Sequence, residues 1–247
     1  MKIINKNKFS DKLPDAILFD ADNTLYPYDP AHNAAREAVM KKVTRRFSIS
    51  EEDFNKAYED SRKRIKKRLG SIASSHSRLL YMQAMLENIG LGSQILIALD
   101  LEQTYWRTFL SNALIFKGVK EFLEDIRLSS IPTAIVTDLT SQIQFRKVIY
   151  FGLDHYFDYI VTSEEAGFDK PHESSFKIAI EKMNPKGNHI WMIGDNPIND
   201  IAGARDAIDA VTIQKLHDGV IVGKGSNLPD ATFDDFDNLR NFFKNLK

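Results

Sequence analysis

The sequence contains no cysteine among its 247 residues. That absence excludes a disulfide framework, a thiolate nucleophile and any zinc site built on sulfur. The chain also lacks an apolar run approaching the ~20 residues that a bilayer-spanning helix needs. Its first fifteen residues are polar and have no apolar centre typical of a secretory signal, so we expect a cytoplasmic protein with no membrane partner.

A strong charge of either sign is missing as well. The formal net charge of −1 gives no overall attraction to nucleic acid, and we expect no nucleic-acid partner. The sequence shows no internal repeat and no low-complexity segment. Hydrophobic residues make up 43% and charged residues 27%, which suits a globular protein with a substantial core. The length favours one domain with an insertion.

Short apolar runs rich in β-branched residues recur along the chain, at 16–20, 132–137, 159–163, 189–195 and 210–214. Because these runs are apolar throughout rather than alternating, they predict strands covered on both faces. Helical patterns separate the later runs, and strand–helix alternation is typical of a parallel sheet with helices on both sides. The predicted fold class is therefore α/β, with a doubly wound parallel sheet.

Residues 28–114 have a different pattern. Their segments are amphipathic and helix-favouring, and none of them resembles a strand. With 14 basic and 10 acidic residues, the segment carries a net charge of +4. We therefore predict an all-helical insertion over 28–114 within an α/β core formed by 1–27 and 115–247.

Two basic features of the insertion each have two explanations. The run RKRIKKR at 62–68 is either a grip for phosphate or nucleic acid or a solvated helix face, and we favour the solvated face because Glu59 and Asp60 are near enough to pair with it. Arg78 either contacts a substrate or holds the insertion together, and we favour the second.

Polar residues follow the predicted strands where each one ends. Ligands of open parallel sheets bind outside the carboxyl ends of the strands, so these side chains are expected to share one site. They are Asp20, Asp22, Thr137, Asp138, Lys170, Asp195 and Asp200.

Such a group of carboxylates is repulsive unless a cation offsets the charge. Oxygen-only ligands favour Mg²⁺. Thr137 and Lys170 add little as metal ligands beside the acids, but a hydroxyl donor and a point positive charge suit a phosphoryl group. Backbone N–H groups around 21–24 and 137–139 are further expected donors.

Four short motifs resemble those of the haloacid dehalogenase superfamily, in its phosphatase branch. They are DADNTLY (20–26), VTD (136–138), the lysine of GFDKPH (167–172) and GDNPIND (194–200). Their order and spacing are similar to those of subfamily I, the nucleotidase and phosphoglycolate phosphatase-like members. In that group a helical cap lies between the first motif and VTD, where this chain has its insertion.

The resemblance implies a role for each acid of the opening motif. Asp20 is expected to be the nucleophile that forms an aspartyl-phosphate. Asp22 is expected to be the general acid and then the general base, with its backbone carbonyl as a metal ligand. Asn23 stands where glycine is common in the family, and asparagine tolerates the same unusual backbone angles.

The resemblance also implies roles for the later motifs. Thr137, Asp138 and Lys170 are expected to bind the phosphoryl oxygens. Asp195 resembles the family's direct metal ligand, and Asp200 a supporting acid. Together with Asp20 and Asp22 they form the predicted Mg²⁺ site.

The predicted function is Mg²⁺-dependent hydrolysis of small phosphate monoesters, such as nucleoside monophosphates or sugar phosphates, by a monomer or homodimer. A phosphomutase of the same family is the nearest alternative. A haloacid dehalogenase is disfavoured because family members of that kind lack the second aspartate, which is present here as Asp22. A binding protein without turnover has no evident need for both Asp20 and Asp22.

Overall fold

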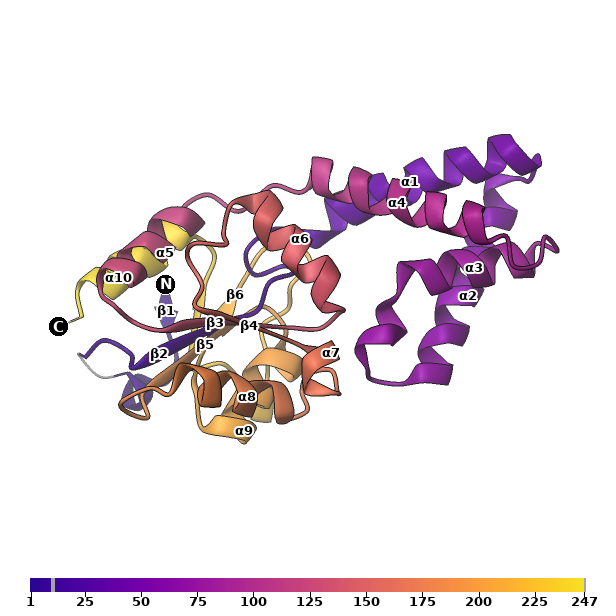
Figure 1. Cartoon of the computed structure of the whole chain (residues 1–247). Coiled ribbons are helices and arrows are strands. Elements are labelled where there is room, and N and C mark those ends of the chain that lie inside the picture. The colour runs from indigo at the N-terminus through magenta and orange to yellow at the C-terminus, as the bar shows by residue number, and fades with distance from the viewer. Residues whose placement is uncertain (10–11, 247) are drawn as a thin grey trace. The chain divides into compact units, whose positions relative to one another are not determined.

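The computed structural model describes residues 1–9 and 12–246, and the chain divides into two compact units. The first unit combines Met1–Pro27 with Leu114–Lys247 and contains the sheet (Figure 1). The second unit, Tyr28–Ala113, is built of helices. That the helical unit serves as a substrate-covering cap stays a prediction.

Seven strands of the described residues form one sheet, in the order β1-β7-β6-β5-β2-β3-β4. Every neighbouring pair from β7 to β4 is parallel, whereas β1 pairs antiparallel with β7. The strands are β1 (Lys2–Ile3), β2 (Ala16–Phe19), β3 (Thr133–Thr137), β4 (Tyr159–Thr162), β5 (Ile190–Gly194), β6 (Val211–Lys215) and β7 (Ala231–Phe233).

The five strands expected from the apolar runs, β2 to β6, are all present, which confirms the predicted α/β class. The two edge strands β1 and β7 were not predicted. They contain two and three residues, too few to show the run of four to eight residues by which a strand is recognised.

Helices connect the parallel strands, as expected for this class. The helices of the first unit are α5 (Val119–Leu128), α6 (Ser141–Phe151), α7 (Ser163–Ala166), α8 (Ser174–Met183), α9 (Gly203–Ile208) and α10 (Phe236–Lys244), of which α10 follows the last strand. Short 3₁₀ turns lie at Lys6–Lys8 and Gly225–Asn227. One helical prediction differs in detail. Between β5 and β6, where a helix is expected, the chain first forms a π-helical turn, Pro197–Ala202, and then continues as α9.

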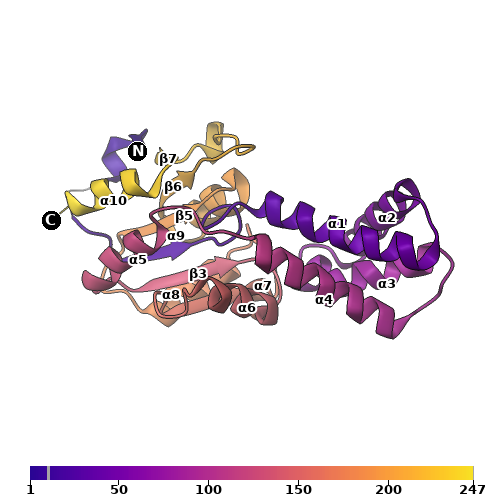
Figure 2. The same ribbon diagram turned by 90° about the horizontal axis from the view of Figure 1, so that it is seen from above.

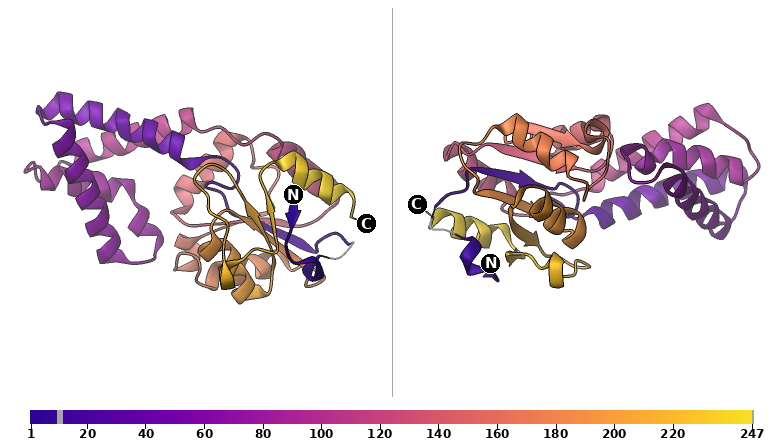
Figure 3. Two further views of the ribbon diagram at one scale, coloured as in Figure 1. Left: turned by 180° about the vertical axis from the view of Figure 1, so that it is seen from behind. Right: turned by 90° about the horizontal axis from the view of Figure 1, so that it is seen from below.

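Helices cover both faces of the sheet, with α8 and α9 on one side and α5, α6 and α10 on the other (Figure 1). Alternate residues of β2 point to opposite faces. Leu18 joins a buried cluster with Phe176 of α8, while Phe19 contacts Phe122 of α5. This double coverage explains why the strands are apolar throughout. Figure 3 shows both chain termini on the same side of this unit.

The helical unit contains α1 (Tyr28–Phe47), α2 (Glu51–Leu69), a 3₁₀ turn (Ala73–His76), α3 (Arg78–Asn88) and α4 (Ile95–Asn112). Helix α1 lies alongside α4, and α2 packs on α3 (Figure 2). Ala31, Ala35, Val39 and Val43 are fully buried at four-residue spacing, so they form the buried stripe of α1.

The two basic features of this unit have partners within it. Arg62 lies 3.6 Å from Glu59, while Ile65 of the same run is buried. The Arg78 guanidinium donates hydrogen bonds to the Tyr28 hydroxyl and the His76 carbonyl, and it lies 5.3 Å from the ring centre of Trp106. These contacts connect α1, α3 and α4.

Across the described ranges 1–9 and 12–246, no helix combines the length and the apolar character required to cross a bilayer.

Phe122 offers a test of the core beneath α5. Its side chain is fully buried and its ring lies against those of Phe19, Phe236 and Phe243. We expect Phe122→Ala to lower the free energy of unfolding by about 3–5 kcal/mol, because it removes a large buried ring and leaves a cavity. Urea denaturation measures the change. Leu128→Ala, at the 70% exposed last residue of the same helix, is the control and should change stability by about 0.5 kcal/mol or less.

Candidate active site

The carboxyl ends of three adjacent parallel strands meet at one edge of the sheet. Strand β2 lies between β3 and β5, so Asp20, Thr137 and Asp195 are neighbours although they are far apart in sequence. The backbone N–H of Asp20 donates a 2.9 Å hydrogen bond to the carbonyl of Ile193, which extends the β2–β5 ladder by one residue. The ladder thereby fixes where the Asp20 side chain begins.

Lys170 lies at the centre of this edge. Its ammonium group is 2.7 Å from Asp20 Oδ1 and 2.7 Å from Asp200 Oδ1, and it donates a 2.9 Å hydrogen bond to the carbonyl of Val136. The Lys170 side chain is 2% exposed, so the charge is almost fully removed from water. Burial alone would lower its pKa, but Asp20, Asp200 and Asp138 raise the pKa of Lys170 well above its usual value. The lysine is therefore positively charged.

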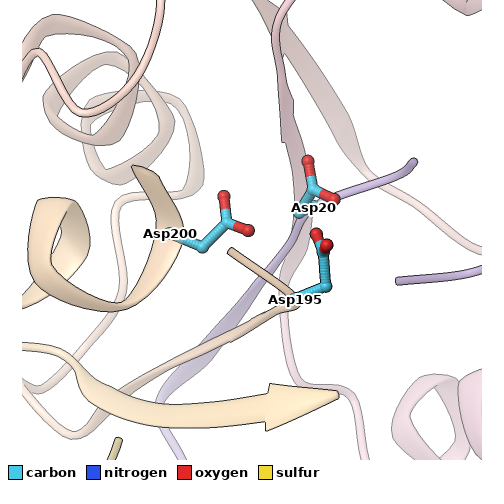
Figure 4. A group of neighbouring side chains, drawn as sticks. All are labelled: Asp20, Asp195 and Asp200. Carbon is cyan, nitrogen blue, oxygen red and sulfur yellow. The ribbon is translucent and has the colours of Figure 1, made fainter. Parts of the chain in front are cut away.

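Three carboxylates converge at this edge of the sheet (Figure 4). Asp20, Asp195 and Asp200 each offer an oxygen, and these oxygens lie within 4.8 Å of one another. Burial raises the pKa of Asp20 to about 7 against the lowering effect of Lys170, and the charge of Asp200 adds to the rise. Burial raises the pKa of Asp195 to about 9, with further contributions from Asp20 and Asp200. Both shifts indicate a site with too little positive charge of its own.

The loop after β5 places Asp200 through local geometry. The Asn196 side chain accepts hydrogen bonds from the N–H groups of Ile198 and Asn199, which begins the π-helical turn. The Asn196 N–H in turn donates to Asp200 Oδ2 at 2.9 Å. A β-carbon on Gly194 would lie 2.4 Å from the Asp200 β-carbon, so a side chain at Gly194 would displace the acid.

The end of β3 is positioned by α6 and by the loop that carries Lys170. Gln144 of α6 donates 2.8 Å and 3.0 Å hydrogen bonds to Thr137 Oγ1 and to the carbonyl of Asp138. Because Thr137 Oγ1 accepts from Gln144, its own proton can be donated elsewhere. The Asp138 carboxylate accepts from the Lys170 backbone N–H at 2.9 Å, and burial raises the pKa of Asp138 to about 6.

One predicted group of donors is partly occupied. The backbone N–H of Leu139, within the predicted 137–139 set, donates to Ser163 Oγ at 2.9 Å. The Asp138 side chain faces the Lys170 backbone, so any role of Asp138 in binding phosphate would fall to its backbone N–H.

Asp22 lies apart from the three-carboxylate group. Its carboxylate forms an ion pair with Lys147 of α6 and accepts a hydrogen bond from the Tyr26 hydroxyl. The turn that follows the two acids uses Asn23 at φ 64°, the left-handed conformation expected at that position. Thr24 then donates its hydroxyl proton to Asp20 Oδ2 at 3.0 Å.

Sequence reasoning missed Gln144 and Lys147. A recognisable pattern was present, because the buried positions of α6 include these two polar residues beside the apolar Ile143, Val148 and Phe151. A glutamine and a lysine on the buried face of an amphipathic helix require partners.

The donor set fits a divalent cation. Counted as ionised, three negative carboxylates and the one positive Lys170 leave two negative charges in a buried space. All the offered atoms are oxygens, which suits a hard cation. Asp20, Asp195 and Asp200 are therefore the side chains that could hold a divalent metal ion.

The raised carboxyl pKa values predict a pH-dependent effect of metal. Without metal, the protonated forms of Asp20 and Asp195 stabilise the fold at pH 4 and below, and this contribution is lost as the pH rises through about 7 and 9. A cation binds the ionised forms, so it competes with protons. We expect 5 mM Mg²⁺ to raise the Tm by about 5 °C at pH 8.5 and about 1 °C at pH 5.

Differential scanning fluorimetry across this pH range measures the effect. Asp195→Asn is the matched variant and should reduce both the pH dependence of the metal-free protein and the gain from Mg²⁺. An equal Mg²⁺ effect at both pH values would contradict the prediction.

Gly194 is predicted to be essential for metal affinity. Gly194→Ala should weaken Mg²⁺ binding by about 10- to 100-fold, because the new methyl group displaces Asp200. The substitution removes none of the predicted metal ligands themselves. Isothermal titration calorimetry with Mg²⁺ provides the measurement. An unchanged dissociation constant would show that Asp200 does not support the ion.

Known proteins share this chain's sequence pattern and its fold. A ribulose-1,5-bisphosphate 5-phosphatase from Halopiger xanaduensis is 35% identical over 76% of this chain and 80% of its own length. A glyceraldehyde 3-phosphate phosphatase from Methanocaldococcus jannaschii is 28% identical over 94% of this chain and 97% of its own. The HAD-hydrolase YfnB from Bacillus subtilis, solved with magnesium, has a TM-score of 0.71 at 21% identity, covering 94% of this chain and 100% of its own. The family of haloacid dehalogenase-like hydrolases matches residues 14–207, and the chain belongs to that family.

Proposed function

We propose that the protein hydrolyses small phosphate monoesters with Mg²⁺, through an aspartyl-phosphate on Asp20. One observation carries this proposal. The two acids of a single loop have different surroundings. Asp20 contacts Lys170 and lies near further carboxylates, whereas Asp22 is hydrogen-bonded to Lys147 and Tyr26. A nucleophile and a proton carrier need such different surroundings.

In the first half of the proposed reaction, an Asp20 carboxylate oxygen attacks phosphorus. The P–O ester bond breaks, and its electron pair goes to the ester oxygen, which takes a proton from the Asp22 carboxyl group. The products are the alcohol, the aspartyl-phosphate on Asp20 and an ionised Asp22. The Lys170 ammonium and the Thr137 hydroxyl stabilise the charge on the transferring phosphoryl group.

The second half regenerates the enzyme. The ionised Asp22 takes a proton from a water molecule whose oxygen attacks phosphorus. The bond between phosphorus and Asp20 breaks, its electron pair returns to the Asp20 carboxylate, and inorganic phosphate is released. Asp22 is again protonated, so each residue ends in its initial state.

Asp20, Asp195 and Asp200 would hold the Mg²⁺ ion, with the Asp22 backbone carbonyl as a further ligand. When bound, the ion favours the ionised form of Asp20 and offsets negative charge on the phosphoryl group. The all-oxygen ligand set suits a hard divalent cation such as Mg²⁺.

We place the substrate among small phosphorylated sugars and nucleoside monophosphates. The two relatives described above act on ribulose 1,5-bisphosphate and glyceraldehyde 3-phosphate, so sugar phosphates are the first candidates. The net charge of +4 on residues 28–114 is compatible with anionic substrates.

A screen of phosphate esters tests this function. We expect Mg²⁺-dependent release of inorganic phosphate from at least one sugar phosphate or nucleoside monophosphate. EDTA should abolish this release, and added Mg²⁺ should restore it. Malachite-green detection of phosphate suffices, and the same assay compares water with a sugar as phosphoryl acceptor. Pure folded protein that releases phosphate from no member of the panel would contradict the proposal.

The nucleophile assignment makes a separate prediction. Asp20→Asn should reduce kcat by at least about 10³-fold, because an amide cannot form the aspartyl-phosphate. Asp206→Asn, at an exposed acid of α9, is the matched control and should keep full activity. Labelling from a ³²P-ester that survives alkali and hydroxylamine would disagree with an acyl-phosphate, which both reagents cleave. Wild-type activity in Asp20→Asn would exclude Asp20 as the nucleophile.

A further inference from the structure

Lys147 is a buried lysine to which the function proposed above assigns no role. It lies on α6, and its side chain is 3% exposed. Its ammonium group is 2.8 Å from Asp22 Oδ1 and 3.0 Å from Asp22 Oδ2. The pair is separated by 125 positions in the sequence, so it depends on how α6 packs beside the loop after β2.

Placing an ammonium group in the interior is unfavourable unless it is paired and hydrogen-bonded. Lys147 pairs with Asp22, whereas Lys170 pairs with Asp20 and Asp200. Asp22 lies outside the group formed by Asp20, Asp195 and Asp200. Each acid of the opening loop therefore has a lysine of its own.

Both carboxylate oxygens of Asp22 accept hydrogen bonds from buried groups. Oδ1 accepts from Lys147 and also from the Tyr26 hydroxyl, whose side chain is 1% exposed. Oδ2 accepts the longer of the two Lys147 contacts. Two buried donors that together contact both oxygens restrict rotation of the carboxyl group.

Helix α6 has a second contact of the same kind. Gln144, one turn before Lys147, donates to Thr137 Oγ1 and to the Asp138 carbonyl. The buried face of α6 thus orients the proposed proton carrier and the proposed phosphate-binding hydroxyl together.

We propose that Lys147 is a positioning residue for the chemical step: together with Tyr26 it fixes the orientation of the Asp22 carboxyl group, which exchanges a proton with the leaving ester oxygen. The proposal rests on the function proposed above for Asp20 and Asp22. Lys147 acts through Asp22 and takes part in no bond change itself.

The leaving group provides the test. Expulsion of an alkoxide needs a proton from Asp22, whereas p-nitrophenolate leaves without one. The ratio kcat/KM reports all steps up to this bond cleavage. We expect Lys147→Met, which keeps the length of the side chain, to lower kcat/KM about 30-fold for the best alkyl phosphate of the panel and less than about 3-fold for p-nitrophenyl phosphate. Lys147→Arg should restore much of the alkyl activity.

Two variants separate the possible outcomes. Arg146→Met removes an exposed charge from the same helix and should leave both substrates unaffected. Asp22→Asn should show the same preference for p-nitrophenyl phosphate as Lys147→Met, but more strongly. If Asp22→Asn shows no such preference, the proposed role of Asp22 fails.

If Asp22→Asn shows the preference and folded Lys147→Met does not, the inference about Lys147 alone is overturned. An equal loss for both esters in Lys147→Met would indicate a structural role. A higher KM with unchanged kcat would indicate direct substrate binding. Either result would replace the positioning role.

Discussion

The ammonium group of Lys170 lies between two buried carboxylates that would otherwise repel each other, and the geometry of the site depends on this contact. Both Asp20 and Asp200 are 2.7 Å from it. Its other bonds reach β3, through the Val136 carbonyl, while the Lys170 backbone is held by Asp138. One lysine thus connects the ends of β2 and β3 with the turn that follows β5.

The order of the strands makes this contact possible. Because β2 is central and parallel to both β3 and β5, three chain segments end at the same edge. The double covering of the sheet by helices allows apolar strands on both faces and keeps the acids at their ends in a poorly solvated place. The raised pKa values of Asp20 and Asp195 are the electrostatic result, and they are also the reason that a divalent cation suits the site.

Asp20 and Asp22 differ in environment although only one residue separates them. Asp20 lies with Asp195 and Asp200, whereas Asp22 contacts Lys147 of α6 just before the chain turns at Asn23. Different neighbours are a common way to give two carboxyl groups different chemistry at one pH. In this phosphatase of the haloacid dehalogenase-like family, the division is made by Lys170 on one side and Lys147 on the other.

Much of this arrangement could be predicted from local sequence. Runs of β-branched residues identified β2 to β6, and the polar residues directly after them identified the members of the site. The parallel topology follows from strand–helix alternation, so the sequence was enough to predict that Asp20, Thr137 and Asp195 lie close together. The positive φ at Asn23 was also foreseeable, because a tight turn needs it and asparagine tolerates it.

The tertiary structure alone decided the partners of these residues. The antiparallel pairing of β1 with β7 joins segments of two and three residues at opposite ends of the chain, and neither has a recognisable pattern. The contacts of Lys147 with Asp22 and of Gln144 with Thr137 depend on the rotation of α6 about its axis. Short-range propensities determine which residues form an element and which residues lie at its end, but helix rotation is set by side-chain packing across the whole sheet. For that reason the sequence by itself determined which acids lie at this edge of the sheet, and the tertiary structure decided which lysine side chains pair with them.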